Sequence, residues 1–246
     1  MRKFFFASIL MIMASFCLAQ DTASWLRYPS IAPDGQTILF CYKGNIYKVP
    51  LSGGQALPLT INEAYDFSPV WSHDGKSIAF ASDRYGNFDV FTMPAGGGEA
   101  KRLTYYSGDD IPSGFSADDQ SVIFSSMRQQ TLKDVQFPDA GFYQLYSVSV
   151  NGGNASQVLP VPALDAVFNS KGDKIIYHDL KGYESDWRKH HTSSVTRDIW
   201  VYDVNTKKYT MLTSNSGEDR NPVFDTDNDS YYYLSEQNGG SFNVYK

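Results

Sequence analysis

Short stretches of aliphatic, β-branched and aromatic residues recur along the chain, and each directly follows a polar turn. The turns lie at 32–35, 72–75, 116–119, 169–172 and 225–228, and the apolar stretches lie at 37–40, 77–80, 121–124, 174–177 and 230–233. An Asp in such a turn can accept a hydrogen bond from its own downstream backbone, and Gly adopts a positive φ at no steric cost. β-branched and aromatic residues suit a pleated, half-buried strand. The pattern therefore predicts a series of β-hairpins.

The acidic and glycine residues of these turns recur in register. Such repetition favours a structural role in each turn over the alternative that Asp34, Asp74 or Asp118 is a catalytic acid. We therefore predict that the repeat-turn residues are Asp34, Gly35, Asp74, Gly75, Asp118, Gly172 and Asp227.

Three further landmarks follow each turn in a fixed order. A polar residue precedes an aliphatic–aromatic pair at 45–47, 89–91, 144–146, 198–200 and 243–245. A Gly-Gly bend occurs at 53–54, 97–98 and 152–153, with Asn-Thr at 205–206, and the units close at 59–60, 103–104, 158–159 and 212–213. The turn anchors at positions 34, 74, 118, 171 and 227 are 40 to 56 residues apart. Repeats of this length with about four short strands each predict the blades of a β-propeller.

The predicted fold is therefore all-β, a propeller over residues 20–246 with about five four-stranded blades. A single blade cannot cover both of its faces, and stacking blades around an axis solves this problem. The last unit ends just after its third strand, so we expect the chain to be the front part of a longer protein; a self-contained five-bladed ring is the alternative. The expected blades are 28–60, 66–104, 112–159, 164–213 and 220–246.

The first nineteen residues have the layout of a secretory signal peptide. Arg2 and Lys3 precede an apolar run at 4–16, and small residues lead to a predicted cleavage after Ala19. The run is shorter than the ~20 residues that span a bilayer, so we expect no membrane span and an exported, periplasmic or secreted protein. Lipidation at Cys17 is the alternative, although bulky Phe16 disfavours it. Cys41 is then the one remaining cysteine, expected as a small core residue.

Composition narrows the function. The formal net charge is −6, which disfavours a nucleic-acid binder that relies on phosphate contacts. With two cysteines in all, neither a disulfide scaffold nor a cysteine-rich zinc site is available.

Two units carry insertions, at 127–142 and 180–197. Insertions in propeller blades usually lie on one face, and functional residues are often found there. The second holds a basic and imidazole cluster that could clamp a carboxylate, such as a peptide C-terminus, through arginine geometry. The alternatives are a solvated hairpin or a surface that docks on a neighbouring domain. The candidate ligand or docking residues are Arg188, His190, His191 and Arg197.

No catalytic residue is predicted in this chain, and no cofactor or metal is expected. The sequence contains no Gly-x-Ser-x-Gly elbow, no His-Glu-x-x-His and no Walker loop. Adjacent His190 and His191 would point apart on a strand, which is poor spacing for one zinc ion. Residues 225–236 imitate a calcium loop, but position six is Ser230 and the flanks are strand-like.

The repeat as a whole resembles the TolB-type propeller repeat. Two stretches resemble bacterial tricorn-like peptidases more narrowly: 65–71 (YDFSPVW) leading into 82–91 (SDRYGNFDVF), and 187–194 (WRKHHTSS) followed by 197–200 (RDIW). The segment 25–29 (WLRYP) is similar to their start after export. The resemblance implies a six-bladed N-terminal propeller, incomplete here, followed by a second propeller, a PDZ-like domain and a serine-peptidase core.

The leading hypothesis is a non-catalytic propeller of an exported tricorn-like serine peptidase that guides peptide substrate or product and docks on downstream protease domains. One alternative is a TolB-like periplasmic module that binds a protein partner. Another is the propeller of a prolyl-oligopeptidase-type hydrolase.

Overall fold

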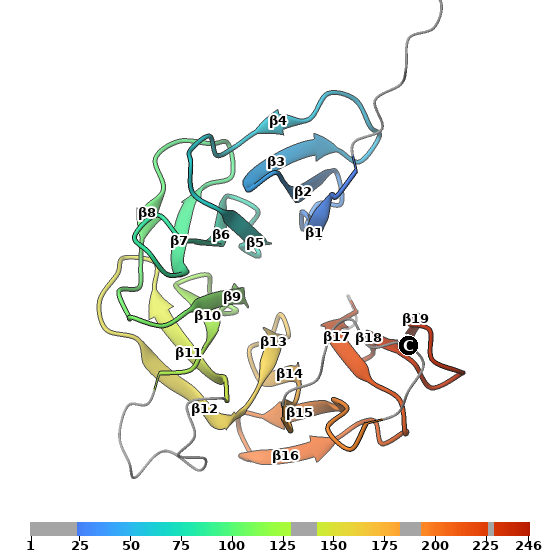
Figure 1. The fold of residues 1–246 in the computed structure, drawn as a ribbon. Helices are drawn as coiled ribbons and strands as arrows, with labels where there is room; N and C mark the ends of the chain where they lie inside the picture. The colour runs from blue at the N-terminus through green and yellow to red at the C-terminus, as the bar shows by residue number, and fades with distance from the viewer. Residues whose placement is uncertain (1–23, 129–141, 183–192, 226–228) are drawn as a thin grey trace, which may run out of the picture.

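The structure, a computed structural model, describes residues 24–128, 142–182, 193–225 and 229–246. In these residues every regular element is a β-strand, and the strands form five antiparallel sheets around a common axis (Figure 1). Blades 1 to 4 have four strands each, and blade 5 has three described strands. The prediction of an all-β propeller with about five blades is confirmed.

Blade 1 consists of β1 (Arg27–Ile31), β2 (Thr37–Tyr42), β3 (Asn45–Pro50) and β4 (Leu57–Pro58). Blade 2 consists of β5 (Asp66–Trp71), β6 (Ser77–Ser82), β7 (Asp89–Pro94) and β8 (Lys101–Arg102). Blade 3 consists of β9 (Asp110–Phe115), β10 (Ser121–Ser126), β11 (Gln144–Ser149) and β12 (Ser156–Pro162). Blade 4 consists of β13 (Leu164–Phe168), β14 (Lys174–His178), β15 (Ile199–Asp203) and β16 (Lys208–Met211). The described strands of blade 5 are β17 (Asp219–Phe224), β18 (Tyr231–Ser235) and β19 (Asn243–Tyr245).

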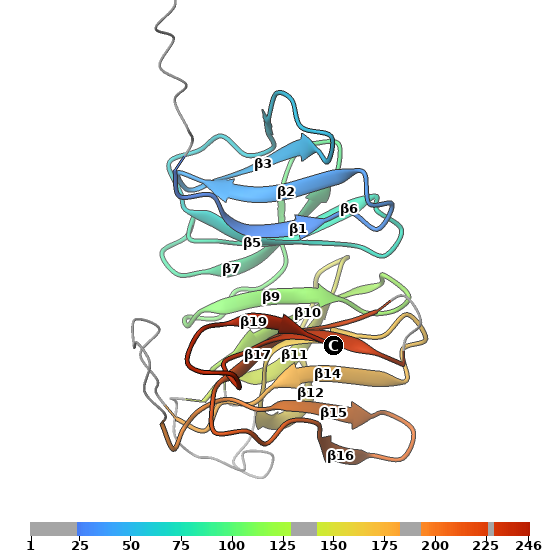
Figure 2. The same ribbon diagram turned by 90° about the vertical axis from the view of Figure 1, so that its right-hand side faces the viewer.

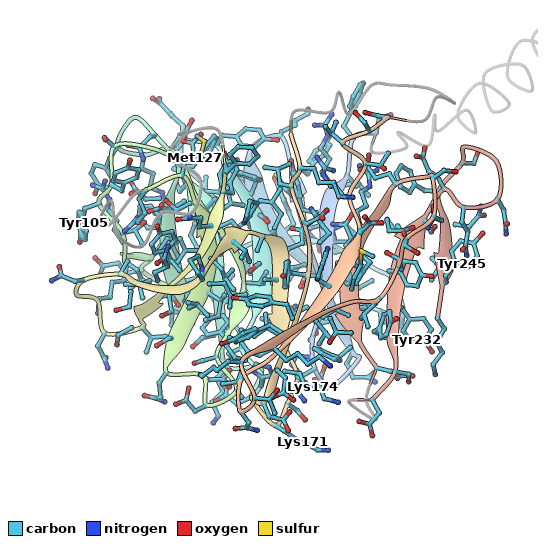
Figure 3. All side chains as sticks on the ribbon, turned by 90° about the horizontal axis from the view of Figure 1, so that it is seen from below. Tyr105, Met127, Lys171, Lys174, Tyr232 and Tyr245 are labelled. Carbon is cyan, nitrogen blue, oxygen red and sulfur yellow. The ribbon has the colours of Figure 1, made fainter. Side chains whose placement is uncertain are left out.

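The first strand of each blade lies innermost. Strand β5 packs between β1 and β9, and β13 packs between β9 and β17, so the innermost strands line the axis in chain order. Figure 2 shows β1, β5 and β9 side by side, and in Figure 1 the arc of blades opens between blade 5 and blade 1. We call the end at which these innermost strands begin the loop end, and the opposite end the turn end. Figure 3 shows Met127 toward the loop end and Lys171 and Lys174 at the turn end.

The tight turns at the turn end are stabilised by hydrogen bonds that their Asp, Ser and Gly residues make. In blade 2, Ser72 O accepts a hydrogen bond from Gly75 N at 3.0 Å, and Gly75 has a φ of +68°. Hydrogen bonds from the backbone and side chain of Lys76, and from Ser72, lower the pKa of the Asp74 carboxyl to about 2. In blades 1 and 3, Asp34 and Asp118 likewise accept a hydrogen bond from the backbone N–H two residues later. Gly35 in blade 1 and Gly172 in blade 4 donate their N–H to the first residue of their turns, as Gly75 does. Asp227 lies outside the described residues.

Blade 3 has Asp119 where the turns of blades 1, 2 and 4 have glycine. Asp119 takes a φ of +56°, a conformation that Asp tolerates better than most residues. Its carboxylate accepts hydrogen bonds from the backbone N–H groups of His73 (2.8 Å) and Asp74 (2.9 Å). The substitution therefore joins the turn of blade 3 to the turn of blade 2.

The Leu-Thr pair that closes a unit forms hydrogen bonds with the start of the third strand at the loop end. In blade 1, Leu59 N donates to Ile46 O at 2.7 Å, and Ile46 N donates to Thr60 Oγ1 at 2.9 Å. Thr104 and Thr213 accept the same bond from Val90 and Ile199, each at 2.9 Å. Each threonine thus satisfies a strand N–H that would otherwise be buried without a partner.

The core lies between neighbouring blades. Each of three apolar clusters joins two consecutive blades: Leu39, Ile46, Ile78, Phe80, Phe91 and Met93 between blades 1 and 2; Ala79, Val90, Leu103, Phe115, Val122, Phe124, Tyr146 and Val148 between blades 2 and 3; and Ile123, Leu145, Leu159, Ala163, Ala166, Ile175 and Tyr177 between blades 3 and 4. Each fully buried Leu, Ile or Phe stabilises the fold by about 1.5–3 kcal/mol. After Ile199 the described part of the chain has no buried Val, Leu, Ile, Met, Phe, Tyr or Trp side chain.

Candidate functional site

The loop end brings residues of successive blades together through backbone hydrogen bonds. The first residue of an innermost strand donates its N–H to the connection that precedes the third strand of the previous blade. Asp66 donates to Gly44 O and Asp110 to Phe88 O, each at 2.8 Å, and Asp219 donates to Arg197 O at 3.0 Å. The connections between second and third strands are therefore held against the innermost strands of the next blade.

Buried aspartates hold the loop-end arginines of blades 2 and 3. Arg84 pairs with Asp66 at 3.0 Å, and Arg128 pairs with Asp110 in the equivalent position; both carboxylates are fully buried. Burial raises the pKa of Asp110, while hydrogen bonds from Ser126 and the charge of Arg128 lower it. Removing either partner of such a buried pair leaves an uncompensated charge, so these pairs fix the loop connections in place.

Blade 4 lacks this pair, because Ala163 stands where the other two blades have Asp66 and Asp110. A different group of charges fills the space between blades 4 and 5. We call it the blade 4–5 cluster, and it consists of Asp165, His178, Arg197, Glu218, Arg220 and Asn221.

Glu218 is the acidic centre of the blade 4–5 cluster. Arg197 Nη1 lies 2.8 Å and Arg220 Nη1 lies 3.7 Å from Glu218 Oε1. The Glu218 side chain is 4% exposed and that of Arg197 is 13% exposed. Arg220 also stacks on Phe242, with its guanidinium carbon 4.0 Å from the ring centre. Two guanidinium groups thus share one buried carboxylate.

His178 occupies the centre of the cluster and is 3% exposed in its side chain. Its Nδ1 accepts a hydrogen bond from the backbone N–H of Asn221 at 3.3 Å, and Asn221 Nδ2 donates to Asp165 Oδ2 at 2.6 Å. Burial, followed by the charges of Arg197 and Arg220, holds the pKa of His178 well below its usual range. The imidazole is therefore neutral at pH 7, and because Nδ1 accepts, its proton lies on Nε2.

The innermost strands are bulged where they meet this cluster. Asp165 and Asn221 have φ values of +48° and +52°, and the register of both strands shifts at these residues. Tyr28 and Ser68 take the same conformation in blades 1 and 2. Left-handed backbone at non-glycine residues costs energy and persists only where surrounding contacts impose it. The bulge is a feature of the innermost strands, and in blades 4 and 5 it carries polar side chains into the cluster.

The side chains of the blade 4–5 cluster can donate hydrogen bonds to polar atoms of a ligand. Its two arginines can engage a carboxylate or a carbonyl oxygen, and its neutral imidazole carries a hydrogen-bond donor. Within residues 24–128, 142–182, 193–225 and 229–246, no three His, Cys, Asp or Glu side chains lie together as a metal site would require. The same residues contain no helix long and apolar enough to cross a membrane.

Of the candidate ligand residues expected from sequence, Arg197 lies in this cluster. Arg188, His190 and His191 lie outside the described residues. Sequence reasoning missed His178, Asp165 and Asn221. An alignment of the repeats offers one signal for His178, because it stands where the other blades have the uncharged residues Ala81, Ser125 and Leu234.

Residues 23–246 match the family described as the tricorn protease N-terminal β-propeller domain. The chain belongs to this family. The match to the tricorn-type propeller covers every described residue, and it confirms the resemblance found in the sequence. No curated protein matches the chain.

Solved structures of similar fold include two TolB proteins. A protein assigned as TolB from Agrobacterium tumefaciens superposes with a TM-score of 0.70 at 18% identity, covering 88% of this chain and 72% of its own. TolB from Acinetobacter baumannii gives 0.66 at 22% identity, covering 89% of this chain and 51% of its own. A puromycin hydrolase superposes with a TM-score of 0.52 at 12% identity, covering 87% of this chain and 34% of its own. At these identities the likeness establishes the propeller fold, and this tricorn-type chain spans only about half of the A. baumannii protein.

Proposed function

We propose that this chain is the non-catalytic propeller of an exported tricorn-like serine peptidase, guiding peptide substrate or product and docking on protease domains of the parent protein. The observation that carries the proposal is the family match over residues 23–246. It is supported by the grouping of loop connections, arginines and a buried imidazole at one end of the axis.

The loop end is the face proposed to meet the peptide. Arg197 lies at the end of the second predicted insertion, and its guanidinium is oriented by Glu218 at 2.8 Å. A peptide carboxylate or carbonyl would accept hydrogen bonds from the guanidinium groups of the blade 4–5 cluster. Arg188, His190 and His191 are proposed to extend the same surface.

Binding of labelled, unstructured peptides to the purified chain, measured by fluorescence anisotropy, tests this role. Replacing Arg188, His190 and His191 together by serine should weaken binding by about tenfold, the order expected from losing charge-assisted hydrogen bonds. The matched control replaces Lys171 and Lys174 at the turn end by serine and should leave affinity unchanged (Figure 3). Equal losses in both variants, or no binding to the parent chain, would contradict the proposal.

A second candidate is a TolB-like module that binds a folded protein partner, favoured by the superposition on two TolB structures. The coding sequence downstream of Lys246 distinguishes the candidates. A second propeller followed by a PDZ-like segment supports the tricorn-like parent, and a Gly-x-Ser-x-Gly elbow supports an oligopeptidase-type hydrolase instead. A stop codon directly after Lys246 supports the binding module.

Export is part of the proposal, on the strength of the leader-like residues 1–19. N-terminal sequencing of the protein from the cell envelope or medium should begin at Gln20. Retention of Met1 in cytoplasmic protein would refute export.

A further inference from the structure

A second site lies at the loop end of blade 1, away from the blade 4–5 cluster. It is a pocket of about 480 Å³ whose walls include Trp25, Arg27, Tyr42, Lys43 and Tyr65, and we call it the blade-1 pocket. Its volume falls within the range of small-molecule sites in proteins. The walls come from the segment that leads into β1, the first residue of β1, the hairpin between β2 and β3, and the residue that precedes β5.

The pocket is open because the β2–β3 connection is a two-residue turn. Lys43 and Gly44 have φ values of +49° and +78°, which is the conformation of a tight type I′ hairpin. The equivalent connection of blade 2 runs from residue 83 to residue 88. Blade 1 thus has less chain available to cover the space beside Tyr65.

The hairpin tip is fixed against the next blade. Gly44 O accepts a hydrogen bond from Asp66 N at 2.8 Å, and a Cβ atom on Gly44 would lie 3.3 Å from the Tyr65 ring. Tyr65 is held in turn by its backbone N–H, which donates to Asp83 Oδ1 at 2.7 Å, and by ring contacts with Phe67 and Phe88. The wall formed by Lys43 and Tyr65 is therefore preorganised, which reduces the entropy lost on binding.

Two cations of the pocket lack an acidic partner in the described part of the chain. Arg27 lies over the Trp25 ring at 5.4 Å, and Lys43 Nζ lies 5.3 Å from the centre of the Tyr42 ring. No described carboxylate is within 4.0 Å of either group. The other loop-end arginines differ, since Arg84, Arg102 and Arg128 each pair with a buried aspartate. In a protein of net charge −6, this arrangement concentrates positive charge beside aromatic surface.

We propose that the blade-1 pocket binds a small anion carried on an aromatic ring. Arg27 and Lys43 would hold the carboxylate or phosphate group, and the rings of Trp25, Tyr42 and Tyr65 would stack on the aromatic body. Trp25 is 74% exposed, and stacking a ligand ring on it would remove apolar surface from water. This site is independent of the peptide-guiding role proposed above.

Isothermal titration calorimetry of the full chain tests the proposal with three probes of similar shape: phenylacetate, phenyl phosphate and the neutral phenylacetamide. We expect both anions to bind with affinities in the millimolar range or better, and phenylacetamide to bind at least about tenfold more weakly. The two anionic probes distinguish a carboxylate site from a phosphate site, since the tighter one identifies the preferred group.

The variant Arg27→Gln/Lys43→Asn removes both charges, and Asn tolerates the positive φ of position 43. It should weaken the binding of both anions by about tenfold or more, whereas the turn-end control Lys171→Gln should change nothing. Thermal melting of the double variant checks that it is folded. Absence of anion binding, equal binding of phenylacetamide, or unchanged affinity in the folded double variant would overturn the proposal.

Discussion

The interface between blades 2 and 3 and the interface between blades 4 and 5 are built from opposite materials. Between blades 2 and 3, Phe115, Phe124, Tyr146 and their neighbours form an apolar cluster. Between blades 4 and 5, the buried groups include Glu218, Asp219 and Glu236, and arginines supply the compensating charge. Apolar contact is non-directional and tolerant, whereas buried charges are stable only while every partner is present. One fold thus combines a stable half with a half whose stability depends on charge.

The difference also relates to function. A buried apolar surface offers a ligand no specific contact, whereas the blade 4–5 cluster presents arginine and imidazole groups that can recognise polar atoms. The innermost strands of both regions run along the same axis, so the same propeller can supply rigidity on one side and recognition on the other.

The largest expected effect is the loss of an aromatic ring from the apolar interface. Phe124→Ala should lower the free energy of unfolding by about 3–5 kcal/mol, because Phe124 is fully buried and its loss leaves a cavity. The matched change in blade 5, Tyr233→Ala, should cost only about 1 kcal/mol, since Tyr233 is partly exposed. Urea denaturation measures the loss in free energy of unfolding for both variants. Equal losses would contradict the claim that the two interfaces differ in their apolar packing.

Removing the acidic centre of the blade 4–5 cluster should have the next largest effect. Glu218→Gln keeps the shape but removes the charge shared by Arg197 and Arg220, and it should cost about 3 kcal/mol. Replacing exposed Glu63 by Gln is the control and should change stability by less than about 0.5 kcal/mol. A stable Glu218→Gln variant would mean that the cluster is solvated.

Lowering the pH should weaken the blade 4–5 interface through His178. The pKa of His178 is depressed in the folded chain, so below the unfolded value the unfolded state binds a proton that the folded state does not. Stability should therefore fall as the pH drops below about 6.5, by at most about 1.4 kcal/mol per pH unit. Denaturation of the parent chain and of His178→Gln at pH 7 and pH 5.5 measures the difference. Identical pH dependence in the two proteins would show that His178 does not cause the loss of stability at low pH.

Salt should produce the smallest effect. Raising NaCl from about 0.05 M to about 0.5 M shortens the screening length and should speed amide exchange in β17–β19 more than in β9–β12. The charges at the cluster are partly buried, so the change in opening free energy should stay below about 1 kcal/mol. Exchange that rises equally in both blades would show that the two interfaces respond alike.

Much of the fold could be predicted from sequence because its signals are local. The Asp-Gly turns, the strand patterns and the Leu-Thr pairs each depend on residues close together in the chain, as in the Thr60 and Ile46 pair. The polar blade 4–5 interface could not be predicted in this way. His178, Asn221 and Arg197 come from three different segments of the chain, and the hydrogen bond from Asn221 to His178 forms at the bulge where Asn221 has a positive φ. Asp119 is similar, because its partners His73 and Asp74 lie in the preceding blade.

Hydrogen exchange of the chain with and without a bound peptide tests the central claim most directly. If the loop end of the tricorn-type propeller receives peptide, protection should appear around residues 193–198 and 218–221 while the turn end around 169–174 stays unchanged. Protection confined to the turn end or to the outer strands, or no protection under saturating peptide, would contradict it.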